Sequence, residues 1–447
     1  MIAKFIKLLE TKYMLCGLGI FFRLALELSY IDFVSPIYEY AGFELIENNI
    51  KYVESWVLYI LILLVLPARS ERPSDYLMCI SFFSFMAPLL VFYSFADPAR
   101  WILYLVVLQY LIISAVRAGH HSIRILAPRN GPQIATSICV IVIVSATLWM
   151  LSTVGLSNFN LDLDAVYDFR EQANDAIYSG VMGYVVVWAT TVAGPFILMI
   201  ALRDKRRILT IGVICLHILW FGISSHKSVL FYPTLVLSLY TLFKYSRAMA
   251  VIPSGMTLVV SISLIAFYVT ESLFLSGMFI RRVYFVPSHL TFTYFDFFST
   301  NSFVYWSNSF LSWLINYPYT ESVALVIGNH LNDSTLWANN SFFATGYMHA
   351  GVLGVIIYGI TAGLIMKILD SSMSQGTPIW MALSTVIIPF NSLFTSADLT
   401  TTLLTHGLGF GLFILYLMGG KSAQIRHKPV GLSAALSTDA STRKLKV

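Results

Sequence analysis

Two adjacent arginines, Arg281 and Arg282, are the side chains in this sequence best suited to bind phosphate. They lie in the aromatic stretch FIRRVYFVPSHLTFTYFDFFS, residues 279–299, of a mostly apolar chain. A guanidinium group is a planar fork of donors that fits phosphate oxygens and keeps its charge at any working pH. The pair therefore predicts a site for a lipid-borne diphosphate. Snorkelling of either arginine towards lipid headgroups is the alternative interpretation.

Two other basic residues are candidates for the same site. Arg170, in VYDFREQAND, is the only basic residue of a long polar loop, and Lys227 follows a histidine in the short turn GISSHKSVLF. Ionisable groups at membrane depth are functional candidates by default. The alternatives are an ion pair between Arg170 and a neighbouring carboxylate, which stabilises a surface little, and an exposed turn lysine at Lys227.

General-base chemistry needs a side chain that can accept a proton, and three residues are candidates, ranked His349, Asp296 and His289. Each lies among apolar or aromatic residues, where burial and neighbouring charges can move a pKa towards the working pH. A satisfied structural histidine is the alternative for His349. We also expect close backbone contact around His349, because glycines flank it at three positions, namely Gly346, Gly351 and Gly354.

Sugar binding is predicted for four residues whose side chains offer amides or aromatic faces: Asn339, Asn340, Tyr294 and Trp306. Helix capping by the asparagines and membrane-interface anchoring by the aromatic residues are the alternatives. We predict no metal site and no cofactor. The acidic pair Asp162 and Asp164 is a weak signal alone, the four cysteines lack ligand spacing, and no P-loop, HExxH or nucleophile-elbow motif occurs.

The elements that must position these residues are membrane helices. The 447 residues are 57% hydrophobic and only 11% charged, whereas soluble domains carry about a quarter charged residues. Runs of about 20 apolar residues predict transmembrane helices, and we count about twelve in one all-α integral membrane domain covering residues 1–447. They lie near 13–34, 52–67, 76–95, 100–116, 133–155, 177–200, 208–225, 228–243, 251–271, 347–368, 378–395 and 401–418.

The distribution of basic residues predicts the sidedness of these spans. With the N-terminus in the cytoplasm, all but seven of the 28 Lys and Arg residues fall on the cytoplasmic side, as the positive-inside rule expects. Both termini are then cytoplasmic. The seven basic residues left for the membrane and the far side are Arg23, Lys51, Arg100, Arg170, Lys227, Arg281 and Arg282.

Two far-side loops are long, at residues 156–176 and 272–346, and loops of this length are usually functional. The second is rich in aromatic residues, so we expect short interfacial helices there, with Tyr305, Trp306, Trp313 and Tyr317 at headgroup level. Residues 419–447 read as a disordered cytoplasmic tail. The composition predicts membrane lipid as a partner; nucleic acid is not predicted.

The chain resembles the Wzy-type oligosaccharide repeat-unit polymerases, also called O-antigen polymerases. The resemblance covers most of the chain and rests on LDAVYDFREQ, GISSHKSVLFYPTL, MFIRRVYFVPSHLTFTYFDFFS and WANNSFFATGYMHAGVLGVIIYGITAGLIMKILD. It implies a polytopic protein of the bacterial inner membrane with a GT-C-like glycosyltransferase architecture and periplasmic loops. The implied substrates are undecaprenyl-diphosphate-linked repeat units, and the growing glycan is transferred from its carrier to the sugar of an incoming unit.

The resemblance and the residues together predict a metal-independent polymerase whose active site faces the periplasm. Arginines would stabilise the departing diphosphate, a role in which one fixed donor is typically worth about a hundred- to a thousand-fold in rate. A chain-length regulator is a further partner that the sequence leaves open. The alternatives are an O-antigen ligase, which transfers glycan to lipid A-core, and a lipid-linked oligosaccharide flippase, although the charges do not line the midplane as a transporter would require.

Overall fold

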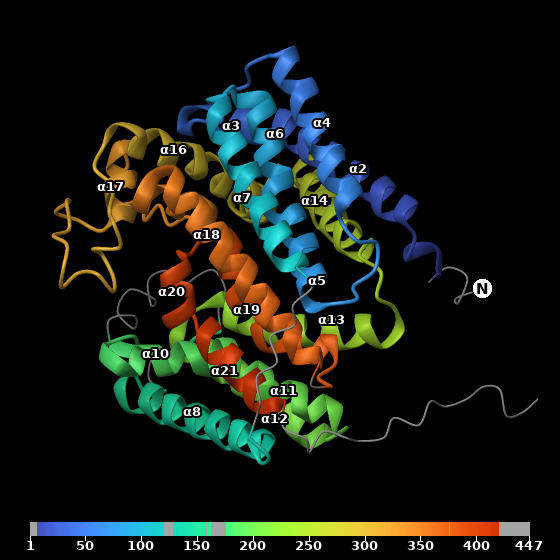
Figure 1. Cartoon of the computed structure of the whole chain (residues 1–447), viewed down its shortest axis with the longest axis vertical. Coiled ribbons are helices and arrows are strands. Elements are labelled where there is room, and N and C mark those ends of the chain that lie inside the picture. The colour runs from blue at the N-terminus through green and yellow to red at the C-terminus, as the bar shows by residue number, and fades with distance from the viewer. Residues whose placement is uncertain (1–6, 120–127, 157–158, 162–175, 375, 420–447) are drawn as a thin grey trace, which may run out of the picture.

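The computed structural model describes the chain apart from residues 1–6, 120–127, 157–158, 162–175, 375 and 420–447 (Figure 1). The described part is helical, and its one β-bridge joins Arg69 and Ala248. Eight of its helices are long and apolar enough to cross a membrane: Lys12–Ala41, Pro73–Ala96, Arg100–Ala118, Gly131–Thr153, Gly180–Arg203, Arg207–Ser224, Val251–Thr270 and Phe342–Met373. The all-α, polytopic membrane class is thereby confirmed, whereas the number twelve and the GT-C-like architecture remain predictions.

The four other predicted spans are also helical in the structure but are shorter, more polar or interrupted. Three correspond to single helices: α4 (Asn49–Val65), α13 (Lys227–Tyr245) and α19 (Ile379–Thr395). The run predicted at 401–418 is two helices, α20 (Leu399–Leu404) and α21 (Leu408–Met418). Gly407 between them has a left-handed φ of 85°, and the Trp188 indole N–H donates to the Leu404 carbonyl (2.7 Å), so the break is satisfied by side-chain contact.

A proline follows each π turn in the described helices. Four π segments occur in the described chain, η1 (Tyr30–Val34), η3 (Phe82–Met86), η4 (Ala189–Ala193) and η5 (Gly277–Phe285). Each is followed two residues later by a proline, namely Pro36, Pro88, Pro195 and Pro287. A helical proline has no N–H and clashes with the carbonyl four residues back. The wider i→i+5 turn relieves that clash, as in the Val286 N–H bond to the Arg281 carbonyl.

The π segments divide the longest helices into named parts. The first span is α2 (Lys12–Ser29), η1, α3 (Ser35–Tyr38) and η2 (Glu39–Ala41), and the third is α5 (Pro73–Ser81), η3 and α6 (Ala87–Ala96). The remaining helices are α7 (Arg100–Ala118), α8 (Gly131–Thr153), α10 (Gly180–Trp188), α11 (Gly194–Arg203), α12 (Arg207–Ser224), α14 (Val251–Thr270), α15 (Leu273–Ser276), α16 (Val286–Thr300), α17 (Val323–His330) and α18 (Phe342–Ser374).

The predicted cytoplasmic loops meet at one end of the molecule, which we call the basic end (Glu10, Lys12, Arg69–Arg72, Asp75, Arg117, Arg247 and Asp370). Arg117 forms an ion pair with Asp75 (2.8 Å), and the Ser74 N–H donates to Asp370 (2.9 Å). Further links at this end join Arg69 to Glu10 (3.3 Å) and Arg247 to Glu71 (3.2 Å). Loops that the sequence assigns to one side of the membrane therefore lie side by side.

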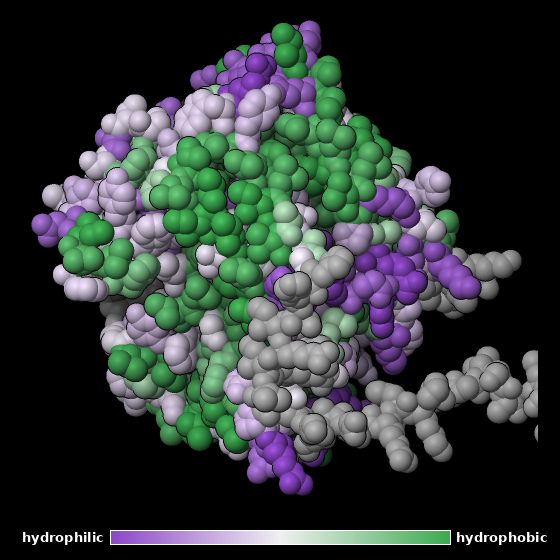
Figure 2. All heavy atoms as spheres, viewed as in Figure 1, coloured by the Kyte–Doolittle hydropathy of each residue, from purple (hydrophilic) through white to green (hydrophobic). Residues whose placement is uncertain are grey.

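The predicted far-side loops meet at the other end, which we call the aromatic end (Tyr38, Phe43, Phe92, Tyr93, Trp101, Arg281, His289 and Trp306). Helix α16 crosses the ends of several spans there: Phe292 stacks on Tyr93 of α6 (6.5 Å), and Phe295 meets Trp101 of α7 (6.0 Å). Between the two ends, Figure 2 shows a broad apolar area over α7 and α18, with hydrophilic side chains above it and at the lower right.

Helix α18 bends sharply at Ala350 and Gly351, which have non-helical backbone angles (Gly351 φ 58°). The bend folds the two parts against each other, because a Cβ on Gly354 would lie 1.9 Å from the Gly346 carbonyl oxygen. Tyr358 also packs on Gly346. The expected close backbone approach around His349 is confirmed, and it places this histidine at the end of the first helical part.

Candidate functional site

Arg281 is a cation at the aromatic end for which the described residues supply no acidic partner. It lies in η5, half buried, with its guanidinium 4.2 Å from the ring centre of Tyr38 and 5.5 Å from that of Phe43. Its Nε atom is buried and has no hydrogen bond within the described part of the chain. A buried guanidinium nitrogen without a partner is costly, so Arg281 is a candidate to bind an acceptor from outside the protein.

Three other basic residues of the far-side set are neutralised by acids. Arg23 pairs with Glu27 (2.8 Å), Lys51 with Asp97 (2.7 Å) and Arg100 with Glu54 (3.0 Å). Among the residues described here, Arg281 has no carboxylate within 4 Å. Arg23, Lys51 and Arg100 are therefore structural cations, whereas Arg281 is a candidate to bind an anion.

His289 lies beside Arg281, because both face Phe43. Its half-buried ring is 5.2 Å from Phe43 and 5.7 Å from Phe92, and neither ring nitrogen forms a hydrogen bond within the described chain. A Cβ added at Gly42, where φ is 86°, would come within 2.7 Å of His289 Nε2. Burial and the charge of Arg281 lower the pKa of His289 to about 4. The imidazole is therefore neutral at pH 7, with a lone pair available to accept a proton.

The other predicted cations occupy different positions. Arg282 is exposed on η5 next to Arg281, and Lys227 begins α13 with a half-buried side chain. Arg170, like the weak acidic pair Asp162 and Asp164, lies outside the described residues. The diphosphate roles predicted for these three cations remain predictions.

His349 holds the chain segment after α16 against the end of the first part of α18. The backbone N–H groups of Val304 and Tyr305 donate to the carbonyls of Met348 and His349 (both 3.0 Å), and the Trp306 N–H donates to His349 Nδ1 (3.0 Å). Tyr305 and Trp306 both have a positive φ, 48° and 56°, which is a strained conformation for non-glycine residues. The indole of Trp306 stacks on the imidazole at 4.9 Å.

Asp398 lies on the other side of His349. It caps α20, accepting from the Thr400 N–H (2.9 Å), and its Oδ1 accepts from the Tyr358 hydroxyl (2.8 Å) and lies 3.4 Å from His349 Nε2. Burial would raise the pKa of this carboxyl, but the neighbouring His349 ring and the hydrogen bonds from Thr400 outweigh it and hold the pKa well below its usual range. Asp398 is thus an anion that ties α18 to α20.

This geometry disfavours His349 as a general base. The imidazole is fully buried, its Nδ1 lone pair is occupied by the Trp306 N–H, and its Nε2 faces Asp398. His349 is also remote from Arg281: at a helical rise of about 1.5 Å per residue, Arg281 lies about 20 Å along the η5–α16 axis from Phe295, which stacks on Tyr347 near His349 (4.4 Å). The structure pairs Arg281 with His289 and places His349 elsewhere.

The remaining predicted residues divide into exposed and internal ones. Asp296 and Asn339 are exposed. Tyr294 is buried and donates to the Ala338 carbonyl (2.7 Å), and the buried Asn340 accepts from the Ser341 N–H (2.7 Å). The Trp306 Nε1 donates to Tyr358 (3.0 Å). The polar groups of these last three side chains are used within the protein, and no contact in the structure tests their sugar-binding roles.

Sequence reasoning did not single out two residues that shape these clusters. Tyr38 and Asp398 contact Arg281 and His349, respectively, through the fold alone. A signal for Asp398 existed, because it is the sole carboxylate between Asp370 and Asp439 and begins the cap pattern DLT. Tyr38 offered no such signal, since the far-side loop around it has other aromatic residues.

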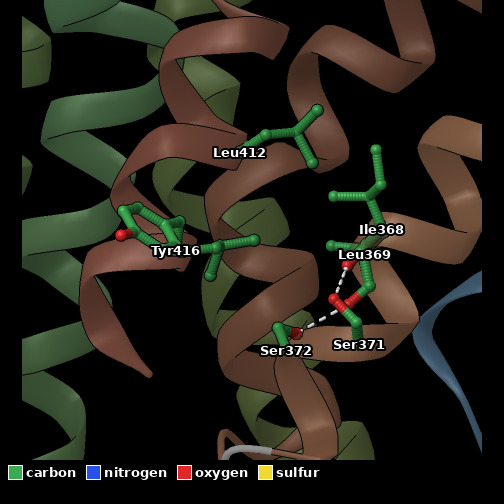
Figure 3. Close-up of a pocket in the computed structure, with 7 residues that line it drawn as sticks. Ile368, Leu369, Ser371, Ser372, Leu412 and Tyr416 are labelled. Atoms are coloured by element: carbon green, nitrogen blue, oxygen red, sulfur yellow. Dashed lines mark hydrogen bonds between the residues drawn. The ribbon is translucent and has the colours of Figure 1, made fainter. Parts of the chain in front are cut away.

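A small pocket lies away from these clusters, towards the basic end of α18 and α21 (Figure 3). Its lining is apolar apart from hydroxyl groups: Ile368, Leu369, Ser371, Ser372, Leu412, Leu415 and Tyr416. Ser371 and Ser372 donate to the carbonyls of Ile368 and Leu369 (2.5 and 2.7 Å). The pocket lacks a charged lining group and suits no part of the predicted chemistry.

Within the described residues, no group of three or more His, Cys, Asp or Glu side chains is placed to hold a metal ion. Comparison with protein-family models, with curated proteins and with solved structures gave no match.

Proposed function

We propose that this protein is a membrane glycosyltransferase that polymerises lipid-diphosphate-linked oligosaccharide repeat units. The observation that carries the proposal is Arg281, a cation at the aromatic end with a buried Nε and no acidic partner among the described residues. A diphosphate supplies the acceptor oxygens that this guanidinium lacks, and Arg282 follows it on the same segment. The resemblance to Wzy-type polymerases supplies the substrate class, with the carrier undecaprenyl diphosphate in the bacterial inner membrane and the site facing the periplasm.

The proposed step moves the growing glycan from its carrier to a hydroxyl of the incoming unit. A new bond forms between that hydroxyl oxygen and the anomeric carbon, and the bond from this carbon to the diphosphate oxygen breaks. The electron pair leaves with the diphosphate, whose developing charge Arg281 stabilises. The hydroxyl proton passes to a neutral base.

We assign the base role to His289 rather than to His349. His289 lies beside Arg281 and has open ring nitrogens, whereas His349 is enclosed by Trp306 and Asp398. Burial and then the charge of Arg281 lower the pKa of His289, and a bound diphosphate would offset the charge of Arg281. The pKa of His289 then rises when substrate is present, which favours proton uptake during transfer.

The test is genetic and uses the lipopolysaccharide or surface polysaccharide of the strain that carries the gene. After deletion and complementation, Arg281→Ala should lower chain extension by about a hundred- to a thousand-fold while the protein still reaches the membrane. Arg281→Lys should rescue poorly because a lysine cannot bind bidentately. Arg100→Gln is the matched control: it removes an arginine from the same end, but one already paired with Glu54.

The gel pattern separates the alternatives. Capping of the core with one repeat in the deletion strain indicates a polymerase, whereas loss of all repeats indicates a ligase or a flippase. A normal ladder from Arg281→Ala would refute the diphosphate role.

A further inference from the structure

We propose that a second surface of the aromatic end binds the sugar part of the lipid-linked substrate, specifically a neutral or amino-bearing pyranose oligosaccharide. This surface, which we call the α17 platform, consists of Tyr317, Tyr319, Glu321, Asn329 and His330. The inference rests on the proposed function, because it assigns the glycan of that same substrate to a place distinct from its diphosphate.

The platform combines flat aromatic rings with planar polar groups, which is the chemistry that a sugar ring requires. The Tyr319 ring packs edge-on against the Tyr317 ring, with 5.8 Å between ring centres. It is tilted against the Phe297 ring, with 6.1 Å between ring centres. Beside these rings, Asn329 donates to Glu321 Oε2 (2.8 Å), and all of Glu321, Asn329 and His330 are exposed. Apolar C–H faces of a pyranose can lie on aromatic rings, while its hydroxyls bond to the carboxylate and amide.

The platform is held in shape before any ligand arrives. The Tyr319 hydroxyl donates to the Ser302 carbonyl (2.5 Å), and the Tyr317 hydroxyl donates to the Glu321 carbonyl (2.8 Å). His330 packs on Phe297 of α16 at 5.2 Å. Glu321 Oε1 has no hydrogen bond within the described chain and so remains open to a ligand. Side chains fixed in this way lose little freedom on binding, which favours affinity.

The charge of this region selects against phosphate and acidic sugars. No lysine or arginine occurs between Arg282 and Lys367, whereas Asp296, Glu321 and Asp333 are all exposed. An anionic lipid surface would meet the same carboxylates and is disfavoured. The diphosphate is therefore directed to Arg281, and the uncharged or positively charged portion of the substrate to the platform.

Helix α16 joins the two places. His289 and Phe297 are about 12 Å apart along the axis at 1.5 Å per residue, enough for more than one sugar ring. Asp296 follows His289 by seven residues and so shares its helix face. Helices α16 and α17 lie together at the upper left of Figure 1. A substrate whose diphosphate is bound at Arg281 can thus extend its glycan along α16 towards Tyr319.

The experiment measures binding of a lipid-free glycan. Lipid-linked units from the deletion strain are cleaved by mild acid, and the released glycan is added to the full-length protein in nanodiscs for saturation-transfer NMR. Tyr319→Ala and Asn329→Ala should each weaken binding by about tenfold, whereas Tyr319→Phe should keep most of it. Trp313→Ala, which removes another exposed aromatic residue (79% exposed), is the matched control.

The outcomes also separate this inference from the proposed function. Arg281→Ala should still bind the free glycan even though it no longer extends chains. Unchanged affinity in Tyr319→Ala and Asn329→Ala, an equal loss in Trp313→Ala, or no binding by the unsubstituted protein would each overturn the platform. None of these results bears on the diphosphate role of Arg281. That role is tested by the polysaccharide ladder of the strain that carries Arg281→Ala. The exposed Asn329→Ala variant decides the matter where Tyr319→Ala does not fold.

Discussion

Arg23 shows how this protein keeps a full charge inside its apolar core without offering it to a ligand. Its Nε donates to Glu27 (2.8 Å), its terminal nitrogens donate to the carbonyl and hydroxyl oxygens of Ser55 (3.0 and 2.6 Å), and its guanidinium lies 4.3 Å from the Trp56 ring centre. The side chain is fully buried and its donors are satisfied. Arg281 has an aromatic neighbour of the same kind but no acid, so the difference between the two arginines lies in the missing counter-ion.

The Arg23–Glu27 pair predicts an asymmetry between single and double substitutions. Arg23→Ala leaves Glu27 buried without its cation, so we expect the free energy of unfolding to fall by about 3–5 kcal/mol. Arg23→Met combined with Glu27→Leu replaces both charges with apolar groups and should be close to neutral. Denaturant unfolding in detergent micelles measures both. Equal destabilisation by the single and double variants would contradict this account.

His289 predicts a pH dependence that differs from that of an ordinary histidine. Because its pKa is lowered to about 4, the ring stays neutral as the pH falls from 8 to about 5 and gains a proton only near pH 4. Removing the adjacent charge in Arg281→Gln should move the pKa upwards but leave it below the ordinary value, because burial, the larger cause, is unchanged. NMR titration of labelled histidine, with His289→Gln identifying the signal, measures both values. If the signal that His289→Gln removes titrates near 6.5 in the unsubstituted protein, the buried position of His289 is wrong.

At the residue scale, the sequence predicts which side chains can bind an anion or accept a proton better than it predicts which residues contact them. Arg281 was predicted as an anion-binding residue from its surroundings, and the fold leaves it without an acid. The ranking of bases placed His349 above His289, since a sequence does not show that Trp306 and Asp398 enclose one histidine while Arg281 adjoins the other. The two contacts that enclose His349 join residues more than 40 positions apart, so no local pattern encodes them.

At the scale of elements, the bend in α18 depends on two glycines meeting backbone to backbone. In Gly354→Ala the new methyl group would lie 1.9 Å from the Gly346 carbonyl oxygen. The two helical parts must then separate, which also displaces Tyr358 from Gly346. The clash is with backbone atoms, so no side-chain rotation relieves it.

We therefore expect Gly354→Ala to lower the free energy of unfolding by about 3 kcal/mol, at the upper end of the usual cost of overpacking. Gly255→Ala, in the second turn of α14 with nothing within 4 Å of the added Cβ, should be neutral or gain about 0.5–1 kcal/mol from helix propensity. Thermal unfolding of the two variants in the same detergent makes the comparison. Equal melting temperatures would rule out the backbone contact.

The sequence predicted most helices but not their interruptions. Apolar runs mark a helix because every backbone group in lipid must be bonded internally, and each of the twelve runs is helical in the structure. The break before α21 was missed, because a single glycine in an apolar run has several possible roles. The π segments were also missed, although Pro36, Pro88, Pro195 and Pro287 mark them; whether a helix bends or widens at a proline depends on the packing around it.

At the scale of the whole molecule, the ion pairs and ring contacts sort the loops into two sets. Residues from the predicted cytoplasmic loops pair with one another at the basic end, and residues from the predicted far-side loops do so at the aromatic end. This sorting agrees with an alternating topology. Which end faces the cytoplasm is still a prediction from the positive-inside rule.

Cysteine labelling tests that sidedness. In a background with the four native cysteines replaced, Ser334→Cys at the aromatic end should react with a membrane-impermeant maleimide added to intact spheroplasts. Glu71→Cys, exposed at the basic end, should react only after the membrane is opened. The opposite labelling pattern would show that the topology is inverted and that Arg281 faces the cytoplasm. The proposed reaction at the periplasmic face would then be wrong.

The proline at position 287 has an effect that reaches beyond its own turn. It follows the π turns of η5, and these turns set the angle about the helix axis between Arg281 and His289, which both contact Phe43. If Pro287 were replaced by alanine, η5 could rewind as an ordinary α-helix. The Arg281 guanidinium would then move away from the His289 imidazole, although neither side chain had been changed.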